Sequence, residues 1–108
     1  MLAPLRWRAV SAQHDYFVYI VSNNTRTTLY IGITSDLHGR IWQHRNPDRP
    51  SFSERYHCIR LVFCEQFREV RDAIAREKQL KGWRREKKNL LTAKMNPRWD
   101  DLAADWFG

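Results

Sequence analysis

A chain of 108 residues can bury one modest hydrophobic core and is too short for two. Its hydrophobic content of 43%, with 13% aromatic residues, excludes a disordered chain, and no apolar run of 18 residues predicts a membrane-spanning helix. The formal net charge of +7 favours a polyanionic partner, nucleic acid before an anionic membrane. Charge alone equally permits a basic surface without a partner.

Residues 1–15 show no helical or strand pattern, and we expect a flexible N-terminal tail. The first element is a strand over residues 16–21, YFVYIV, in which every second residue shares a face. A polar turn then leads to a second strand over residues 29–33, so the two should form an antiparallel hairpin. A register with Tyr19 opposite Gly32 puts Tyr19 and Tyr30 on one face of the sheet.

The second strand runs directly into a helix that either Ser35 or Asp36 can cap. Leu37 and Ile41 supply its buried stripe. The next two residues of interest, Arg40 and His44, are four positions apart, with His44 almost on that stripe and Arg40 at its edge. We expect both to point inward beside a tyrosine, whereas a helical phase one residue different would make them a solvated face.

The second half of the chain predicts a third strand over residues 57–65 after a proline-containing loop, then two helices. The first helix begins at Glu69 and ends at Gly82, and the second runs from near Trp83 to before Asn96. Their expected apolar residues are Val70, Ala73, Ile74 and Leu80 in the first helix and Trp83, Leu90 and Leu91 in the second. Residues 96–108 should dock back through Trp99, Leu102, Trp106 and Phe107.

These elements predict an α/β fold, a small three-stranded antiparallel sheet flanked by about three helices, in one domain over residues 16–95. Cys58 and Cys64 lie in the third predicted strand, about 20 Å apart at roughly 3.3 Å per residue, which is beyond disulfide reach. We therefore expect reduced, buried thiols and a cytoplasmic location. The four histidines do not cluster with them at zinc spacing.

Glu77 is the most informative single residue, because it falls between Ile74 and Leu80 in the stripe that should be buried. A carboxylate there costs several kcal/mol unless a cation or hydrogen bonds satisfy it. Either an Arg or Lys pairs with Glu77, or a divalent metal does. Together with the two tyrosines, Arg40 and His44, it makes five polar groups directed inward from separate elements, which suggests a site.

The order of these residues resembles the GIY-YIG nuclease superfamily, in particular small members related to the nuclease domain of the excision-repair endonuclease. The resemblance covers roughly residues 16–93. Its first motif appears here as Val18-Tyr19-Ile20, with valine in place of the glycine, and its second as Tyr30-Ile31-Gly32. The family's helix arginine falls on Arg40, its metal-binding glutamate on Glu77 and its asparagine on Asn89. His44 matches a position that holds histidine or tyrosine in relatives.

The resemblance implies hydrolysis of phosphodiester bonds in DNA with Mg²⁺ or Mn²⁺ held by Glu77, whose other ligands would be water and phosphate oxygen. Without a second acid in the pattern, one metal is expected. Arg40 would bind the phosphate and its developing charge. Tyr30 and His44 would share proton transfer with Tyr19 orienting them, and Gly32 and Asn89 would support the backbone. His44 is the easier base, because an ordinary tyrosine is protonated at neutral pH.

Residues 71–94 carry nine Lys and Arg against three acids, a basic stretch next to the predicted site. Such a run can grip phosphates without reading sequence. The residues assigned to nucleic-acid binding are Lys81, Arg84, Arg85, Lys87 and Lys88. Trp42, if exposed, could stack on a base, or it could pack against the C-terminal tail.

Each of these residues also has a plain reading. Tyr19 and Tyr30 could be aromatic residues packing across the hairpin, and Asn89 could be a surface residue. For the whole protein, the alternatives to an endonuclease are a non-catalytic nucleic-acid-binding module and an accessory subunit whose protein partner supplies substrate targeting.

Overall fold

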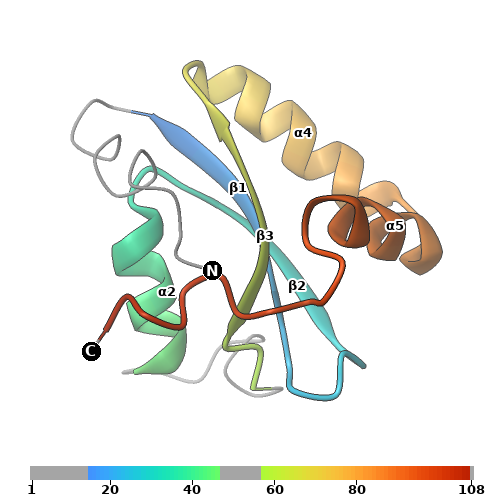
Figure 1. The fold of residues 1–108 in the computed structure, drawn as a ribbon. Helices are drawn as coiled ribbons and strands as arrows, with labels where there is room; N and C mark the ends of the chain where they lie inside the picture. The colour runs from blue at the N-terminus through green and yellow to red at the C-terminus, as the bar shows by residue number, and fades with distance from the viewer. Residues whose placement is uncertain (1–14, 47–56, 108) are drawn as a thin grey trace.

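The computed structural model describes residues 15–46 and 57–107. In these residues the chain forms one antiparallel sheet with strand order β2-β1-β3, with α2 on one face and α4 and α5 on the other (Figure 1). This arrangement confirms the predicted α/β fold. The elements are β1 (Tyr16–Ser22), β2 (Leu29–Thr34), α2 (Leu37–Arg45), β3 (Arg60–Phe67), α4 (Val70–Gly82) and α5 (Arg85–Met95).

The central strand β1 is the most completely buried element, because helices cover both faces of the sheet. Its alternation sends Phe17, Tyr19 and Val21 into the core beneath α2. Val18 and Ile20 enter the second core, beneath α4. The position of Tyr19 in the core beneath α2 determines where the candidate site forms.

The hairpin of β1 and β2 has the predicted register, with Tyr19 opposite Gly32. Asn23 closes its turn, since its carbonyl accepts from the Arg26 amide at 3.1 Å and its side-chain oxygen accepts from the Thr28 amide at 3.1 Å. Helix α2 follows β2 directly and is capped by Asp36, whose carboxylate accepts from the Gly39 amide at 3.0 Å.

Strand β3 begins at Arg60, not at the predicted residue 57, and continues to Phe67. The predicted start is wrong because His57 adopts a left-handed backbone with φ of 57°, and the Ile59 amide then donates to the His57 carbonyl at 3.0 Å. This tight turn occupies the residues just before the strand. Both cysteines are free and buried, as predicted.

The predicted apolar faces of α4 and α5 are partly wrong. Ala73 and Leu80 are fully buried, but Val70 is 44% exposed, Ile74 39% and Leu90 72%. Strands lie about 4.8 Å apart, so three of them span roughly 10 Å, about the diameter of one helix. Two helices on so narrow a sheet cannot each bury a full stripe.

The C-terminal segment after α5 crosses the molecule toward α2 (Figure 1). Leu102 donates its amide to the Leu61 carbonyl of β3 at 2.8 Å, and Asp101 forms an ion pair with Arg45 of α2. Trp99 is buried in the core beneath α4, whereas Leu102, Trp106 and Phe107 pack against the core beneath α2. The expected tail over residues 1–15 lies outside the described residues except for Asp15, and the expected loop over residues 46–56 does so except for Asn46.

No helix in the described ranges combines the length and the apolar character that crossing a membrane requires.

Candidate active site

Tyr19 and Gly32 are in close contact across the β1–β2 hairpin. A Cβ atom built on Gly32 would lie 2.4 Å from the Tyr19 hydroxyl oxygen and 2.5 Å from Cζ, closer than real Cβ contacts. The Tyr19 ring therefore crosses the backbone of β2 at this position. Only glycine leaves that space, which explains why YIG and not another β-forming triplet occurs here.

His44 and Tyr30 complete an aromatic trio around Tyr19. The Tyr19 hydroxyl and His44 Nε2 share a hydrogen bond of 2.9 Å. The His44 ring centroid lies 5.6 Å from each tyrosine ring, in edge-to-face geometry. His44 is 6% exposed and Tyr19 1%, whereas Tyr30 is half-buried. Tyr30 is thus the member of the trio that solvent can reach.

Burial raises the pKa of the Tyr19 phenol well above its ordinary value. The neighbouring Tyr30 raises this pKa further, the Arg40 guanidinium lowers it, and the Glu77 carboxylate raises it. Tyr19 therefore stays protonated at neutral pH and serves as a neutral hydrogen-bonding group. The charges of Arg40 and Glu77 thus act on the pKa of Tyr19 in opposite directions.

Arg40 is exposed, and the expectation that its side chain points inward is wrong. His44, one turn later on α2, is buried as predicted. The difference follows from Arg40 lying at the edge of the buried stripe, where a long side chain can carry its charge into water. Among the described residues Arg40 has no ion-pair partner, so its guanidinium remains available for an anion.

Glu77 lies on α4 with 17% of its side chain exposed, and its Oε2 is 3.3 Å from the Lys81 Nζ. Of the two alternatives raised by the sequence, the structure contains the ion pair with a basic residue. Lys81 is 53% exposed and sits on a flexible stem, so it can turn away from the carboxylate.

The donor set around Glu77 is compatible with one Mg²⁺ or Mn²⁺. Within residues 15–46 and 57–107 no group of three or more His, Cys, Asp and Glu side chains could enclose a metal. A magnesium ion nonetheless needs only one or two carboxylates, because it keeps several waters and takes phosphate oxygens from its substrate. Glu77 fits that requirement as a single protein ligand.

Asn89 orients the Arg85 side chain, which connects α5 to the hairpin turn. Its side-chain oxygen accepts from Arg85 Nε at 2.9 Å, and Arg85 also donates to the Thr27 carbonyl at 3.0 Å and to the Arg26 carbonyl. This geometry suits the supporting role expected of Asn89, because the residue acts on the turn that precedes Tyr30.

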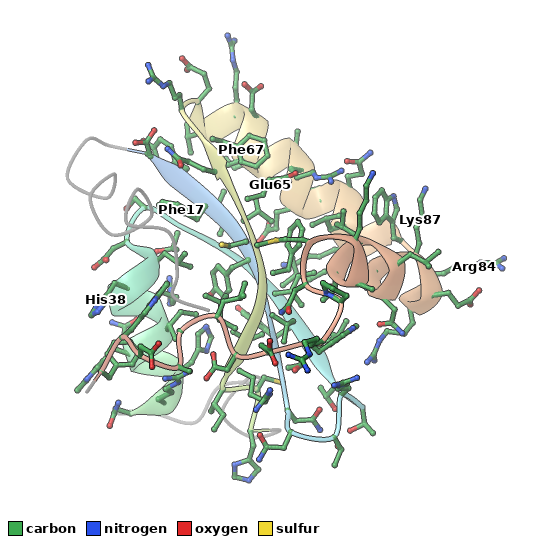
Figure 2. All side chains as sticks on the ribbon, in the orientation of Figure 1. Phe17, His38, Glu65, Phe67, Arg84 and Lys87 are labelled. Carbon is green, nitrogen blue, oxygen red and sulfur yellow. The ribbon has the colours of Figure 1, made fainter. Side chains whose placement is uncertain are left out.

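The five basic residues assigned to nucleic-acid binding differ in their contacts and exposure. Lys81 is paired with Glu77, and Arg85 is engaged with the turn. Lys87 lies 4.3 Å from the Trp83 ring centroid. Figure 2 shows Arg84 and Lys87 extending outward from α5, on the opposite side of the sheet from His38 on α2. Lys88 is half-buried on α5.

Two features escaped the sequence interpretation. The Glu77–Lys81 pair has the i,i+4 spacing that joins opposite charges on a helix, so the spacing could have revealed it. The left-handed backbone of Arg26, with φ of 61°, carries no sequence signal because asparagine or glycine is the usual residue there.

The fold and this constellation of residues have a counterpart in a known family. The model of the GIY-YIG catalytic domain matches residues 15–89, from the start of β1 into α5. The chain belongs to the GIY-YIG family, which is a family of nucleases.

Its relatives include proteins designated UPF0213. One from Bacillus pumilus is 28% identical over 83 residues, covering 77% of this chain and 84% of the relative. Another, from Haloquadratum walsbyi, is 33% identical over 79 residues, covering 72% of this chain and 88% of the relative. The solution NMR structure of the UPF0213 protein BH0048 from Bacillus halodurans is similar in fold, with a TM-score of 0.53 at 23% identity, and covers 84% of this chain and 97% of that one.

Proposed function

We propose that the protein is a divalent-metal-dependent endonuclease that hydrolyses phosphodiester bonds in DNA, with structural selectivity or weak sequence specificity. The observation that carries this proposal is the convergence on Tyr19 of β1 of side chains from three other elements, β2, α2 and α4. His44 forms a hydrogen bond with the Tyr19 hydroxyl, and the Tyr30 ring lies beside the Tyr19 ring. The charges of Arg40 and Glu77 act on the pKa of Tyr19. Membership of a nuclease family supplies the reaction class.

We assign each residue a role according to how exposed its side chain is. Arg40, charged and exposed, binds the scissile phosphate through its forked guanidinium. Tyr30, which is half-buried, and His44, whose ring lies beside it, would share the transfer of the proton from the attacking water: the Tyr30 phenol would take that proton as it gives its own to His44. Tyr19 holds His44 in place as a neutral phenol, since its raised pKa prevents it from acting as a base at neutral pH.

Glu77 would hold the Mg²⁺ or Mn²⁺ ion, which supplies charge stabilisation for the oxygen that leaves. Lys81 must move off the carboxylate for this, and its exposure permits the movement. Two reduced, buried cysteines support a cytoplasmic location.

The Glu77–Lys81 ion pair is also the observation that favours a second candidate function. If that pair persists in the presence of metal, Glu77 is a structural residue, and the protein is a nucleic-acid-binding module or an accessory subunit that requires a protein partner. Such a module would bind nucleic acid with or without a divalent ion.

Cleavage of a substrate panel distinguishes the two functions. Labelled duplex, single-stranded, nicked, flapped and branched DNA, together with RNA, are incubated with Mg²⁺, with Mn²⁺ or with a chelator. The endonuclease proposal expects metal-dependent products from at least one DNA structure. Retention of binding without products from any substrate would favour the module.

A further inference from the structure

A surface hollow of about 480 Å³ lies between the start of α5 and the β1–β2 turn, in the volume range of pockets that hold small ligands. None of its lining residues is among the side chains that surround Tyr19. Its lining combines the guanidinium groups of Arg26 and Arg85 with one carboxylate, one amide and three apolar side chains: Glu86, Asn89, Leu90, Ala93 and Trp99.

The two arginines outnumber the single carboxylate of Glu86, so the lining has a net positive charge, and hydrogen bonds hold both guanidinium groups in place. Arg85 is fastened by Asn89 and by the carbonyls of the turn, and Arg26 donates to the Arg98 carbonyl at 3.1 Å with its guanidinium 5.5 Å from the Trp99 ring centroid. These contacts are to neutral acceptors, and neither arginine has an ion pair in the described part of the chain. A guanidinium has five N–H donors, so donors remain for an anion.

The apolar part of the hollow is unusually accessible. Leu90 is 72% exposed, the highest value among the large exposed hydrophobic residues, and Ala93 lies one turn further along α5. Arg26 reaches the hollow from a left-handed backbone conformation, with φ of 61°, that an arginine adopts only at a cost. A cationic rim beside an apolar floor matches a ligand that carries both an anion and a flat apolar surface.

The hollow and the candidate active site adjoin the same stretch of chain, which runs from the hairpin turn into β2. Strand β2 is an edge strand, and Thr27, whose carbonyl Arg85 holds, comes three residues before Tyr30. At about 3.3 Å per residue that separation is roughly 10 Å, the length of about three stacked nucleotides at 3.4 Å each. A nucleic-acid strand that follows β2 can therefore reach both places.

We infer that this hollow binds one unpaired nucleotide of the strand that flanks the scissile phosphate. Arg26 and Arg85 take the backbone phosphate, and the base lies on Leu90 and Ala93. A base inside a duplex is stacked on both faces and cannot reach such a floor, so the hollow favours a single-stranded flank. The inference rests on the proposed function, because only an endonuclease has a scissile phosphate for this nucleotide to flank.

Binding measured without cleavage tests this inference. The Glu77→Gln protein is titrated in chelator against a labelled oligonucleotide, single-stranded or annealed to its complement, by fluorescence anisotropy. Leu90→Ser removes the floor, with Met95→Ser as control, because Met95 is an exposed apolar residue of α5 outside the hollow. Arg26→Gln removes a rim charge, with Lys94→Gln as the control for general electrostatic attraction.

We expect Leu90→Ser to weaken single-strand binding about threefold to tenfold and to leave duplex binding unchanged. Arg26→Gln should weaken single-strand binding more than Lys94→Gln does. Equal effects of Leu90→Ser and Met95→Ser, or equal losses on both substrates, would overturn the inference even where wild-type protein cleaves DNA. Conversely, the expected binding pattern in a protein that cleaves nothing would retain the hollow as a binding site and reject the endonuclease.

Discussion

At the scale of single residues, the contact between Tyr19 and Gly32 determines the geometry of the site. Tyr19 is 1% exposed and hydrogen-bonded to His44, so its ring cannot move aside for a larger neighbour. The ring occupies the space that a side chain at position 32 would need. The glycine is therefore part of how Tyr19 and His44 are positioned.

Gly32→Ala is expected to lower the free energy of unfolding by about 1–3 kcal/mol, the usual cost of overpacking a filled core. Cleavage should fall at least tenfold, because the displaced phenol would release His44. Chemical denaturation and a cleavage rate measure the two effects. Gly82→Ala is the matched control, since a Cβ at Gly82 meets nothing within 4 Å and alanine favours a helix. Unaltered stability of Gly32→Ala would refute the packing argument.

At the scale of single residues, the sequence predicts some features of the site correctly and others incorrectly. The Tyr19–Gly32 register could be predicted, because strand alternation and a polar turn leave few pairings. The exposure of Arg40 could not, because a helical wheel gives the direction of a Cβ and not the path of a long side chain. The start of β3 could not be predicted either, because histidine, although enriched in left-handed backbone, adopts it in only a minority of cases.

At the scale of elements, α4 carries the charge that the site requires. Its helical period places Glu77 in line with the buried Ala73 and Leu80, and one turn later puts Lys81 beside the carboxylate. The predicted burial is confirmed for Ala73 and Leu80 and is wrong for Val70 and Ile74 of this helix, as it is for Leu90 of α5. Helix periodicity identifies a candidate stripe, but the width of the sheet decides how much of it is covered.

Lys81→Met should strengthen binding of Mn²⁺ to the nucleic-acid-free protein about two- to fivefold, because an exposed ion pair competing with the metal contributes roughly 0.3–1 kcal/mol. Isothermal titration calorimetry measures the affinity. Lys78→Met removes the same charge from an exposed position of α4 without removing the ion pair, and should have a smaller effect. Equal changes in the two variants would mean that overall charge, not competition for Glu77, governs metal affinity.

At the scale of the whole molecule, a three-stranded sheet separates two cores, and β2 is an outer strand of this sheet in the described part of the chain. The aromatic trio and Arg40 lie on the α2 side of the sheet, and Glu77 belongs to α4 on the other side, where α5 and the turn also line the hollow. The family match and the predicted fold agree with this architecture. The substrate, by contrast, could not be predicted from the sequence, since the basic residues are divided among ion pairing, turn contacts and solvent.

The most direct test of the central claim compares Glu77→Ala with Glu65→Ala in both cleavage and thermal unfolding. Glu65 accepts from Arg76 at 2.8 Å and is thus another ion-paired carboxylate beside α4, outside the group that acts on Tyr19. We predict that Glu77→Ala abolishes metal-dependent cleavage while its unfolding temperature stays at or above that of the wild type, and that Glu65→Ala keeps its activity. Wild-type cleavage by Glu77→Ala would contradict the account.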